Sequence, residues 1–388
     1  MTSEPVAEPG HLSCPHCGRF VPPLHYCVRC GSPLEAGRRR REFAAEPGEP
    51  ARALRLFSTL FPHLPQAGYE TFRHAFVLGI LVVAGLAIAG LYPLALVASA
   101  LVLPALFVLY FIEVDLYERA PATVVAATIA WGVLVGAILG NAVRLLSGPG
   151  AADTTTDPSR AVPGAVVLAV LGSALALIGP LSLIRDRAFN DVLDGATFGA
   201  ISGAAYAATA AVVRAGDLLG AGLRPGGDPL PWLLRLATLG ISQPILLAAL
   251  TGSICAAFWL RYREPVRDRA ALGGLGSPAL AILGAAGLLA AAATSRTLLD
   301  LAGGLLATTV AAAIGLLWLR AVIHVGLLEE ANEAEVGPPI RCPNCGRTTP
   351  SHTFCGWCGI SLQAAPRRRP ATPAKPASAP ADPPRPAR

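Results

Sequence analysis

The chain has 388 residues, of which 53% are hydrophobic and only 14% are charged, and its mean hydropathy is +0.53. Soluble domains carry about 25% charged residues, so this composition excludes an ordinary soluble enzyme and indicates a membrane protein. The formal net charge of +6 is modest, and the arginines flank apolar segments, so nucleic acid is not favoured as a partner.

The first element in chain order is a cysteine motif with the spacing C-x2-C-x9-C-x2-C, and the same motif returns near the other end. The eight cysteines are Cys14, Cys17, Cys27, Cys30, Cys342, Cys345, Cys355 and Cys358. Four thiolates suit one tetrahedral ion, for which zinc is the best fit. A glycine follows each second cysteine, as a tight turn with a positive φ favours. We therefore predict zinc ribbons at residues 11–34 and 340–362, each holding one structural Zn²⁺.

Disulfides, a redox-active C-x-x-C pair and a rubredoxin-like iron site are the alternatives for these cysteines. Modules this small bury too little apolar surface to fold without their metal, so metal binding supplies folding free energy. Their thiols must therefore stay reduced, which in a bacterium places them in the cytosol. The abundance of Ala, Gly, Pro and Arg suggests a bacterial source. We expect both metal modules to be cytoplasmic.

Residues 35–68 are interpreted as a basic linker whose arginine run at 38–41 either attracts anionic lipid or flanks the first span. Eight apolar segments then follow, each long enough to cross a bilayer as a helix. They lie at residues 72–91, 94–112, 123–146, 162–184, 192–213, 236–260, 272–294 and 298–319. Residues 363–388, rich in Pro, Ala and Arg, are predicted to be a disordered basic tail.

An even number of spans returns the chain to the side of the membrane on which it began. Arginines flank the first and last spans and crowd the loop after the sixth, which favours cytoplasmic ends by the positive-inside rule. The predicted fold class is an all-α polytopic membrane protein with about eight transmembrane helices at residues 69–328 and a zinc ribbon at each terminus. The predicted location is the bacterial cytoplasmic membrane.

Two polar motifs interrupt the apolar core. The first comprises Tyr110, Asp115, Glu118 and Pro121, and the second comprises Asp194, Gly195, Gly199 and Gly203. Glycines four residues apart form a smooth stripe that allows close helix packing. Asp194 stands near a helix start, where a carboxylate caps or orients the helix.

Together these motifs resemble the PrsW family of intramembrane metalloproteases, with its Tyr-x-x-x-x-Asp-x-x-Glu-x-x-Pro stretch and Asp-Gly-x-x-x-Gly-x-x-x-Gly helix. The resemblance covers roughly residues 70–325 and implies a PrsW-like transmembrane fold. It also implies metal-binding glutamates and histidines in the core. Where these would fall, the chain has Gly172, Ser173, Ala210, Ala211, Gln243, Pro244 and Arg296. Since none is a usual ligand of a hydrolytic metal, we predict no catalytic residue.

The predicted function is that of a non-catalytic membrane scaffold or regulator, which recruits a cytosolic or membrane protein through its ribbons. The lipid bilayer and that protein are the expected partners, and the oligomeric state stays open. One alternative is an active intramembrane metallopeptidase with diverged ligands, which requires a third metal in the core. The other is a transporter or channel, suggested by Pro104, Pro180 and Pro244 within the spans.

Overall fold

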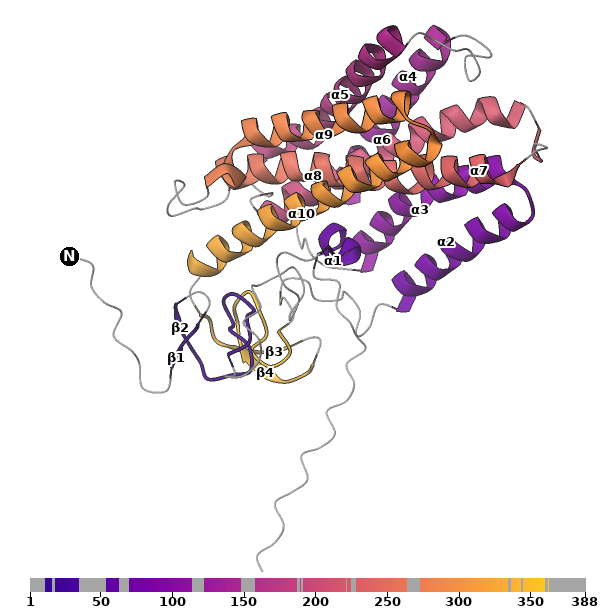
Figure 1. Ribbon diagram of the computed structural model, residues 1–388. Coiled ribbons are helices and arrows are strands. Elements are labelled where there is room, and N and C mark those ends of the chain that lie inside the picture. Colours follow the sequence, from indigo (N-terminus) through magenta and orange to yellow (C-terminus); the bar gives the residue numbers. More distant parts are fainter. Residues whose placement is uncertain are drawn as a thin grey trace, which may run out of the picture.

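The computed structural model describes residues 11–15, 18–34, 54–62, 70–113, 122–147, 158–186, 189, 191–220, 222–224, 228–263, 273–333, 336–342, 345–359 and 362. Within these ranges the protein is a helical bundle with two small β-hairpin modules (Figure 1). The helices are α1 Leu56–Leu60, α2 Glu70–Ile88, α3 Tyr92–Glu113, α4 Ala122–Ser147, α5 Pro158–Ser182, α6 Val192–Gly220, α7 Pro229–Arg235, α8 Gln243–Tyr262, α9 Pro278–Leu298 and α10 Leu301–Glu333. A π-helical segment, Leu236–Ser242, joins α7 to α8, and short 3-10 turns occupy Leu183–Arg185 and Gly273–Gly276.

Eight of the described helical segments are long and apolar enough to cross a membrane, with α7, the π-helical segment and α8 counted as one. This confirms the predicted fold class. The sixth span is longer than predicted, because the helix starts at Pro229 rather than near residue 236. The last helix was also predicted too short. It continues beyond residue 319 to Glu333, because Arg320 and His324, which interrupt the apolar pattern, do not interrupt the helix.

The prolines that suggested a channel do not end their helices. Pro104 and Pro180 lie inside α3 and α5, which continue past them. Pro244 stands in the first turn of α8, directly after the π-helical segment. Since the three prolines leave their helices continuous, the main departure from α-helical geometry along the described spans is the π-helical segment.

The core of the bundle is the pair α6 and α8. Of the α6 span 83% is buried and of the α7–α8 span 78%, against only 6% of the α2 span. A Cβ atom on Gly199 would lie 2.5 Å from the carbonyl oxygen of Thr251, and one on Gly203 would lie 2.7 Å from that of Leu247. The predicted glycine stripe therefore does allow close contact, here between the backbones of α6 and α8.

Helix α1 lies inside the predicted linker at residues 35–68. Ser58, Thr59 and Leu60 are buried, and α1 contacts α10. The guanidinium of Arg320, itself only 1% exposed, donates hydrogen bonds to the hydroxyls of Ser58 at 2.8 Å and Thr59 at 3.3 Å. These bonds tie the segment to the bundle. Residues 35–53 and 63–69, like the predicted tail at 363–388, lie outside the described residues.

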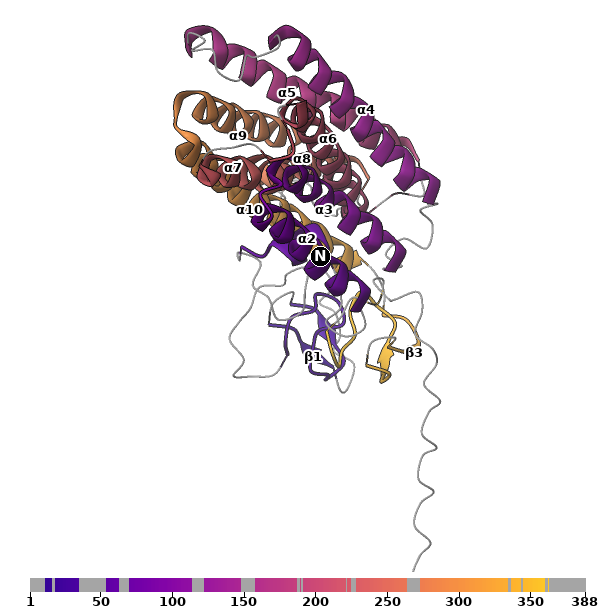
Figure 2. The same ribbon diagram turned by 90° about the vertical axis from the view of Figure 1, so that its right-hand side faces the viewer.

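The two hairpin modules share one topology. Strands β1 Leu12–Ser13 and β2 Phe20–Val21 are antiparallel, as are β3 Pro339–Arg341 and β4 Thr348–Pro350. The register is the same, because the pair Leu12–Val21 in the first module corresponds to Ile340–Thr349 in the second. Figures 1 and 2 show both modules together at one end of the bundle.

Candidate metal centres

Each pair of cysteines belongs to a tight turn closed by a backbone hydrogen bond. The amide of the glycine after the second cysteine donates to the carbonyl of the first cysteine at 2.8–2.9 Å. The four glycines are Gly18, Gly31, Gly346 and Gly359, and their φ angles are 69°, 71°, 72° and 71°. Other residues pay roughly 1–2 kcal/mol in this left-handed region. The prediction that glycine is needed for a positive φ after each C-x-x-C pair is confirmed.

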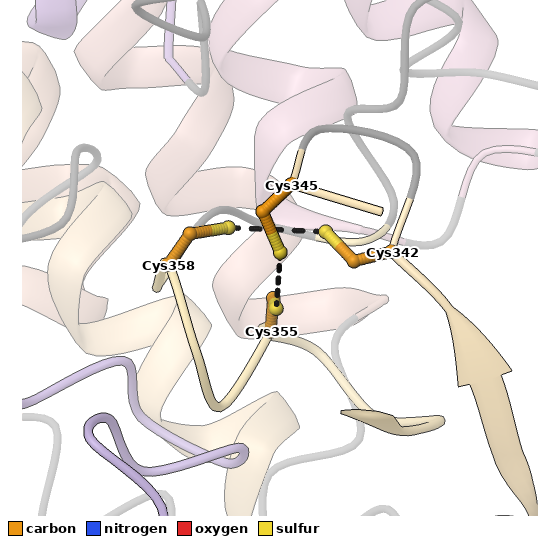
Figure 3. A group of neighbouring side chains, drawn as sticks. All are labelled: Cys342, Cys345, Cys355 and Cys358. Atoms are coloured by element: carbon orange, nitrogen blue, oxygen red, sulfur yellow. Dashed lines mark hydrogen bonds between the residues drawn. The ribbon is translucent and has the colours of Figure 1, made fainter. Parts of the chain in front are cut away.

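In the C-terminal module the four cysteine sulfurs point toward a common centre (Figure 3). Cys342 and Cys358 have their Sγ atoms 3.8 Å apart, and so do Cys345 and Cys355. Thiolates about 2.3 Å from a tetrahedral ion would lie roughly 3.8 Å from one another, whereas a disulfide requires about 2.05 Å. The spacing therefore fits four ligands of one metal ion.

The N-terminal module repeats this arrangement for its described cysteines. Cys14, Cys27 and Cys30 form a cluster, with the Sγ atoms of Cys14 and Cys30 3.7 Å apart. Cys17, the fourth predicted ligand, lies outside the described residues. The described cysteines form no disulfide, so both clusters could hold a metal ion.

The thiol of Cys355 is prepared for metal binding. Hydrogen bonds from Cys342 and then Cys358 lower its pKa well below the ordinary range, against the opposing effect of burial. A lower pKa keeps the sulfur as a thiolate, which is the form that binds metals. The donor set of thiolates at tetrahedral spacing suits zinc, with iron as the other common ion for such a site.

The two modules bind each other through their second cysteine turns. Tyr26 N–H donates to the carbonyl of Gly356 at 2.8 Å, and Phe354 N–H donates to the carbonyl of Val28 at 2.9 Å. Tyr26 corresponds to Phe354 in the repeated motif, and Val28 corresponds to Gly356. Each bond is thus the symmetry counterpart of the other, as in a two-fold dimer within one chain.

This pairing places both modules on the same side of any bilayer that the helices cross. Such an arrangement requires an even number of spans, in agreement with the eight found. The cysteine spacing did not predict the pairing of the modules, because the pairing uses backbone hydrogen bonds. Residues of the N-terminal and C-terminal modules thus contact each other across the whole length of the helical bundle in the sequence.

The described motif residues of the core make contacts that cap or pack helices. Asp194, 4% exposed, accepts a hydrogen bond from Asp191 N–H at 3.3 Å, while the Asp191 carboxylate accepts one from Leu193 N–H at 3.1 Å. These reciprocal bonds form a cap at the start of α6 and confirm the predicted capping role. Gly195 lies under the ring of Trp259, where a Cβ would come within 2.8 Å.

Tyr110 is fully buried and donates its hydroxyl to the carbonyl of Pro62 at 2.7 Å, just after α1. Its ring packs against Phe61, with centroids 5.4 Å apart. Tyr110 thus fastens α1 to α3. The other members of this motif, Asp115, Glu118 and Pro121, lie outside the described residues.

The positions where the resemblance would place ligands carry other contacts. Arg296 donates to the side-chain oxygen of Gln243 at 2.7 Å, so these two positions are brought together. Ser173 donates to its own helix, at the carbonyl of Ala169, and Gly172 lies under the hydroxyl of Tyr206. Among the described residues, groups of three or more His, Cys, Asp or Glu side chains at metal-binding distance occur at the two cysteine sites only.

Comparison with known proteins adds no relative. No family model, no curated protein and no solved structure matches this chain. Its function has to be inferred from its own residues.

Proposed function

We propose that the protein is a non-catalytic membrane scaffold or regulator of PrsW-like fold, which recruits a protein partner through two zinc ribbons. The ribbons would lie on the cytoplasmic face of a bacterial cytoplasmic membrane. The single observation that carries this proposal is the pairing of the two metal modules.

Pairing supports a binding role because it enlarges a small surface. A stable protein–protein interface needs about 800 Å² from each partner, which is a large demand on one ribbon. Two ribbons joined through Tyr26 and Phe354 offer a continuous surface beside the membrane. Metal binding alone would not require the two ribbons to pair with each other.

Exposed apolar side chains occur at equivalent places in the two modules. Leu12 on β1 is 49% exposed and Ile340 on β3 is 37% exposed. Neither belongs to the apolar cluster around its cysteines. Exposed apolar groups next to unpaired strand edges are a usual contact site for another protein. We infer that these strands take part in partner binding.

The absence of catalysis in this proposal rests on what occupies the expected ligand positions. A hydrolytic metal needs several anionic or imidazole ligands and a carboxylate that takes a proton from water. The contact between Arg296 and Gln243 puts a positive charge where the resemblance would put a cation. A metal bound close to this guanidinium would be repelled.

The proposal can be tested by site-specific photocrosslinking in cells. We would replace Leu12 or Ile340 with p-benzoylphenylalanine in the full-length chain, and use Ile88 as the matched control. Ile88 is 88% exposed and is the last residue of α2. Helix α2 begins near α1, at the end of the bundle nearer the modules, and ends at the other (Figure 1). We expect both ribbon positions to give the same discrete protein adduct, and Ile88 to give none.

Lipid adducts alone at Leu12 and Ile340, or nucleic-acid adducts, would contradict recruitment of a protein. Metal analysis tests the catalytic alternative separately. Purified protein is expected to contain two zinc ions per chain. A third ion, removable by chelators and retained when the ribbon cysteines are replaced, would instead support a metallopeptidase.

A further inference from the structure

A groove of about 590 Å³ lies between α2 and the rest of the bundle. One wall is α2, the other is formed by α3, the π-helical segment and the adjoining ends of α7 and α8, and α1 lines one end. Helix α2 packs mainly against α3. Its face toward the π-helical segment borders the groove.

The groove follows one complete stripe of α2. From Phe76 through Val83 to Ile88, its lining residues recur every three or four positions. From Phe76 to Ile88 there are twelve steps of about 1.5 Å along the helix, which together cover roughly 18 Å. The α2 span runs from Thr71 to Ile88, so this stretch crosses the middle of a hydrocarbon core about 30 Å thick, and an acyl chain about 18 Å long would fill it. The groove thus has the length of one extended lipid chain.

The lining of the groove is suited to hydrocarbon. Of the described residues that line it, Ser99 alone has a polar side chain, and its hydroxyl donates to the carbonyl of Leu96 at 2.9 Å. The π-helical segment presents Ile241, 47% exposed, to the same space. An empty space of this size at membrane depth forfeits dispersion contacts, and the one polar side chain that water would meet among these residues, Ser99, already donates its hydrogen bond.

The end of the groove nearer the metal modules carries positive charge. Phe57 of α1 and Phe76 of α2 meet there, with ring centroids 4.7 Å apart. Arg55 directly precedes Leu56, which also lines the groove. Arg73 lies one helical turn before Phe76, and both arginines are exposed. Charges at this level attract the phosphate of an anionic lipid.

We propose that the groove binds one acyl chain of an anionic glycerophospholipid from the leaflet nearer the metal modules, with its phosphate beside Arg55 and Arg73. The chain fills the space along α2, and α1 lines the end of the groove at which the chain joins its headgroup. Because Arg320 holds α1 through Ser58 and Thr59, the floor of the site is fixed to α10. The inference does not depend on the partner of the ribbons.

The test uses the full-length protein in phosphatidylcholine vesicles that contain a small share of phospholipid with a diazirine in its acyl chain. One sample carries tagged phosphatidylglycerol and the other tagged phosphatidylcholine. After irradiation, peptide mapping locates the label. We expect phosphatidylglycerol label to concentrate on α2, α3 and the π-helical segment, above the phosphatidylcholine label.

A matched pair of substitutions fills the groove or leaves it open. Val83 lines the groove, while Val77, 51% exposed, does not. Val83→Trp is expected to reduce groove labelling roughly tenfold, a change of ~1.4 kcal/mol, and Val77→Trp less than about twofold. Ala84→Trp, from the same wall, replaces Val83→Trp if that variant elutes as an aggregate. Arg55→Gln with Arg73→Gln should lower phosphatidylglycerol labelling to the phosphatidylcholine level.

Four results would overturn the proposal. Label spread evenly over all lipid-facing helices would show that the groove has no preferred occupant. Equal labelling in the two tryptophan variants would place the lipid elsewhere. Equal labelling by the two phospholipids in the wild-type protein would remove the role of the anionic headgroup. Crosslinks between two copies of the chain at α2 would identify a second protein molecule as the occupant instead.

Discussion

The two metal modules have the same backbone but different surroundings. Their cysteine spacing, hairpin register and positive-φ glycines agree. In the N-terminal module, Cys14, Cys27 and Cys30 are at most 1% exposed, among the fully buried Val21 and Val28. In the C-terminal module Thr349 and Gly356 replace these valines, Cys345 is exposed and Cys358 is partly exposed. The cysteine turns thus determine the shape of the site, while the neighbouring residues determine how well it is shielded.

Removing ligands should have the largest effect. Structural zinc supplies an apparent ~10–16 kcal/mol in small modules. We expect Cys27→Ser with Cys30→Ser, and equally Cys355→Ser with Cys358→Ser, to lower the zinc content from two ions per chain to one. Elemental analysis of the purified protein measures this. Cys255→Ala, at a buried cysteine in α8, should leave both ions in place. A variant of either module that retained two ions would refute the assignment of its ligands.

Disturbing the contact between the modules should have an intermediate effect. A Cβ on Gly356 would collide with the side chain of Leu24 in the other module, so Gly356→Val is expected to weaken the pairing by about 1–3 kcal/mol. Hydrogen exchange at the Tyr26 and Phe354 amides reports opening of the pair. Adding Leu24→Ala should restore part of the protection, because it removes the contact with Leu24 Cδ1 and leaves the contact with Leu24 Cβ at 2.9 Å. Unchanged exchange in Gly356→Val would mean that the modules do not depend on this contact.

The difference in shielding should give the smallest effect. We expect a maleimide to modify Cys358, which is partly exposed, roughly tenfold faster than its buried counterpart Cys30, equivalent to ~1.4 kcal/mol. In the presence of a chelator the C-terminal ion should leave first. Labelling followed by peptide mapping distinguishes the sites. Faster modification of the N-terminal cysteines would show that burial does not control access to these thiols.

The sequence predicted the spans and the metal sites well because both depend on local patterns. Apolar runs of sufficient length become membrane helices almost regardless of context, and a C-x-x-C pair followed by glycine closes its own turn. The contacts of Asp194 and of Gly199 followed from the same local logic.

Features that depend on distant partners were missed. The five residues of α1 are too few to show a helical period, and their burial is decided by Arg320, more than two hundred positions away. The pairing of Tyr26 with Gly356 uses backbone groups that every residue carries, so no side-chain pattern marks it. The π-helical segment likewise has the composition of an ordinary apolar helix.

The pairing of the modules has a consequence for the time course of synthesis. Tyr26 and Gly356 are about 330 residues apart, which a ribosome working at roughly 5–20 residues per second needs about 15 to 65 seconds to cover. During that interval the first module can already hold its metal, while the edge formed by Tyr26 and Val28 waits for its counterpart. On a polysome, two neighbouring nascent chains can pair through this unpaired edge. Domain-swapped dimers are therefore the expected misassembly when synthesis is slowed.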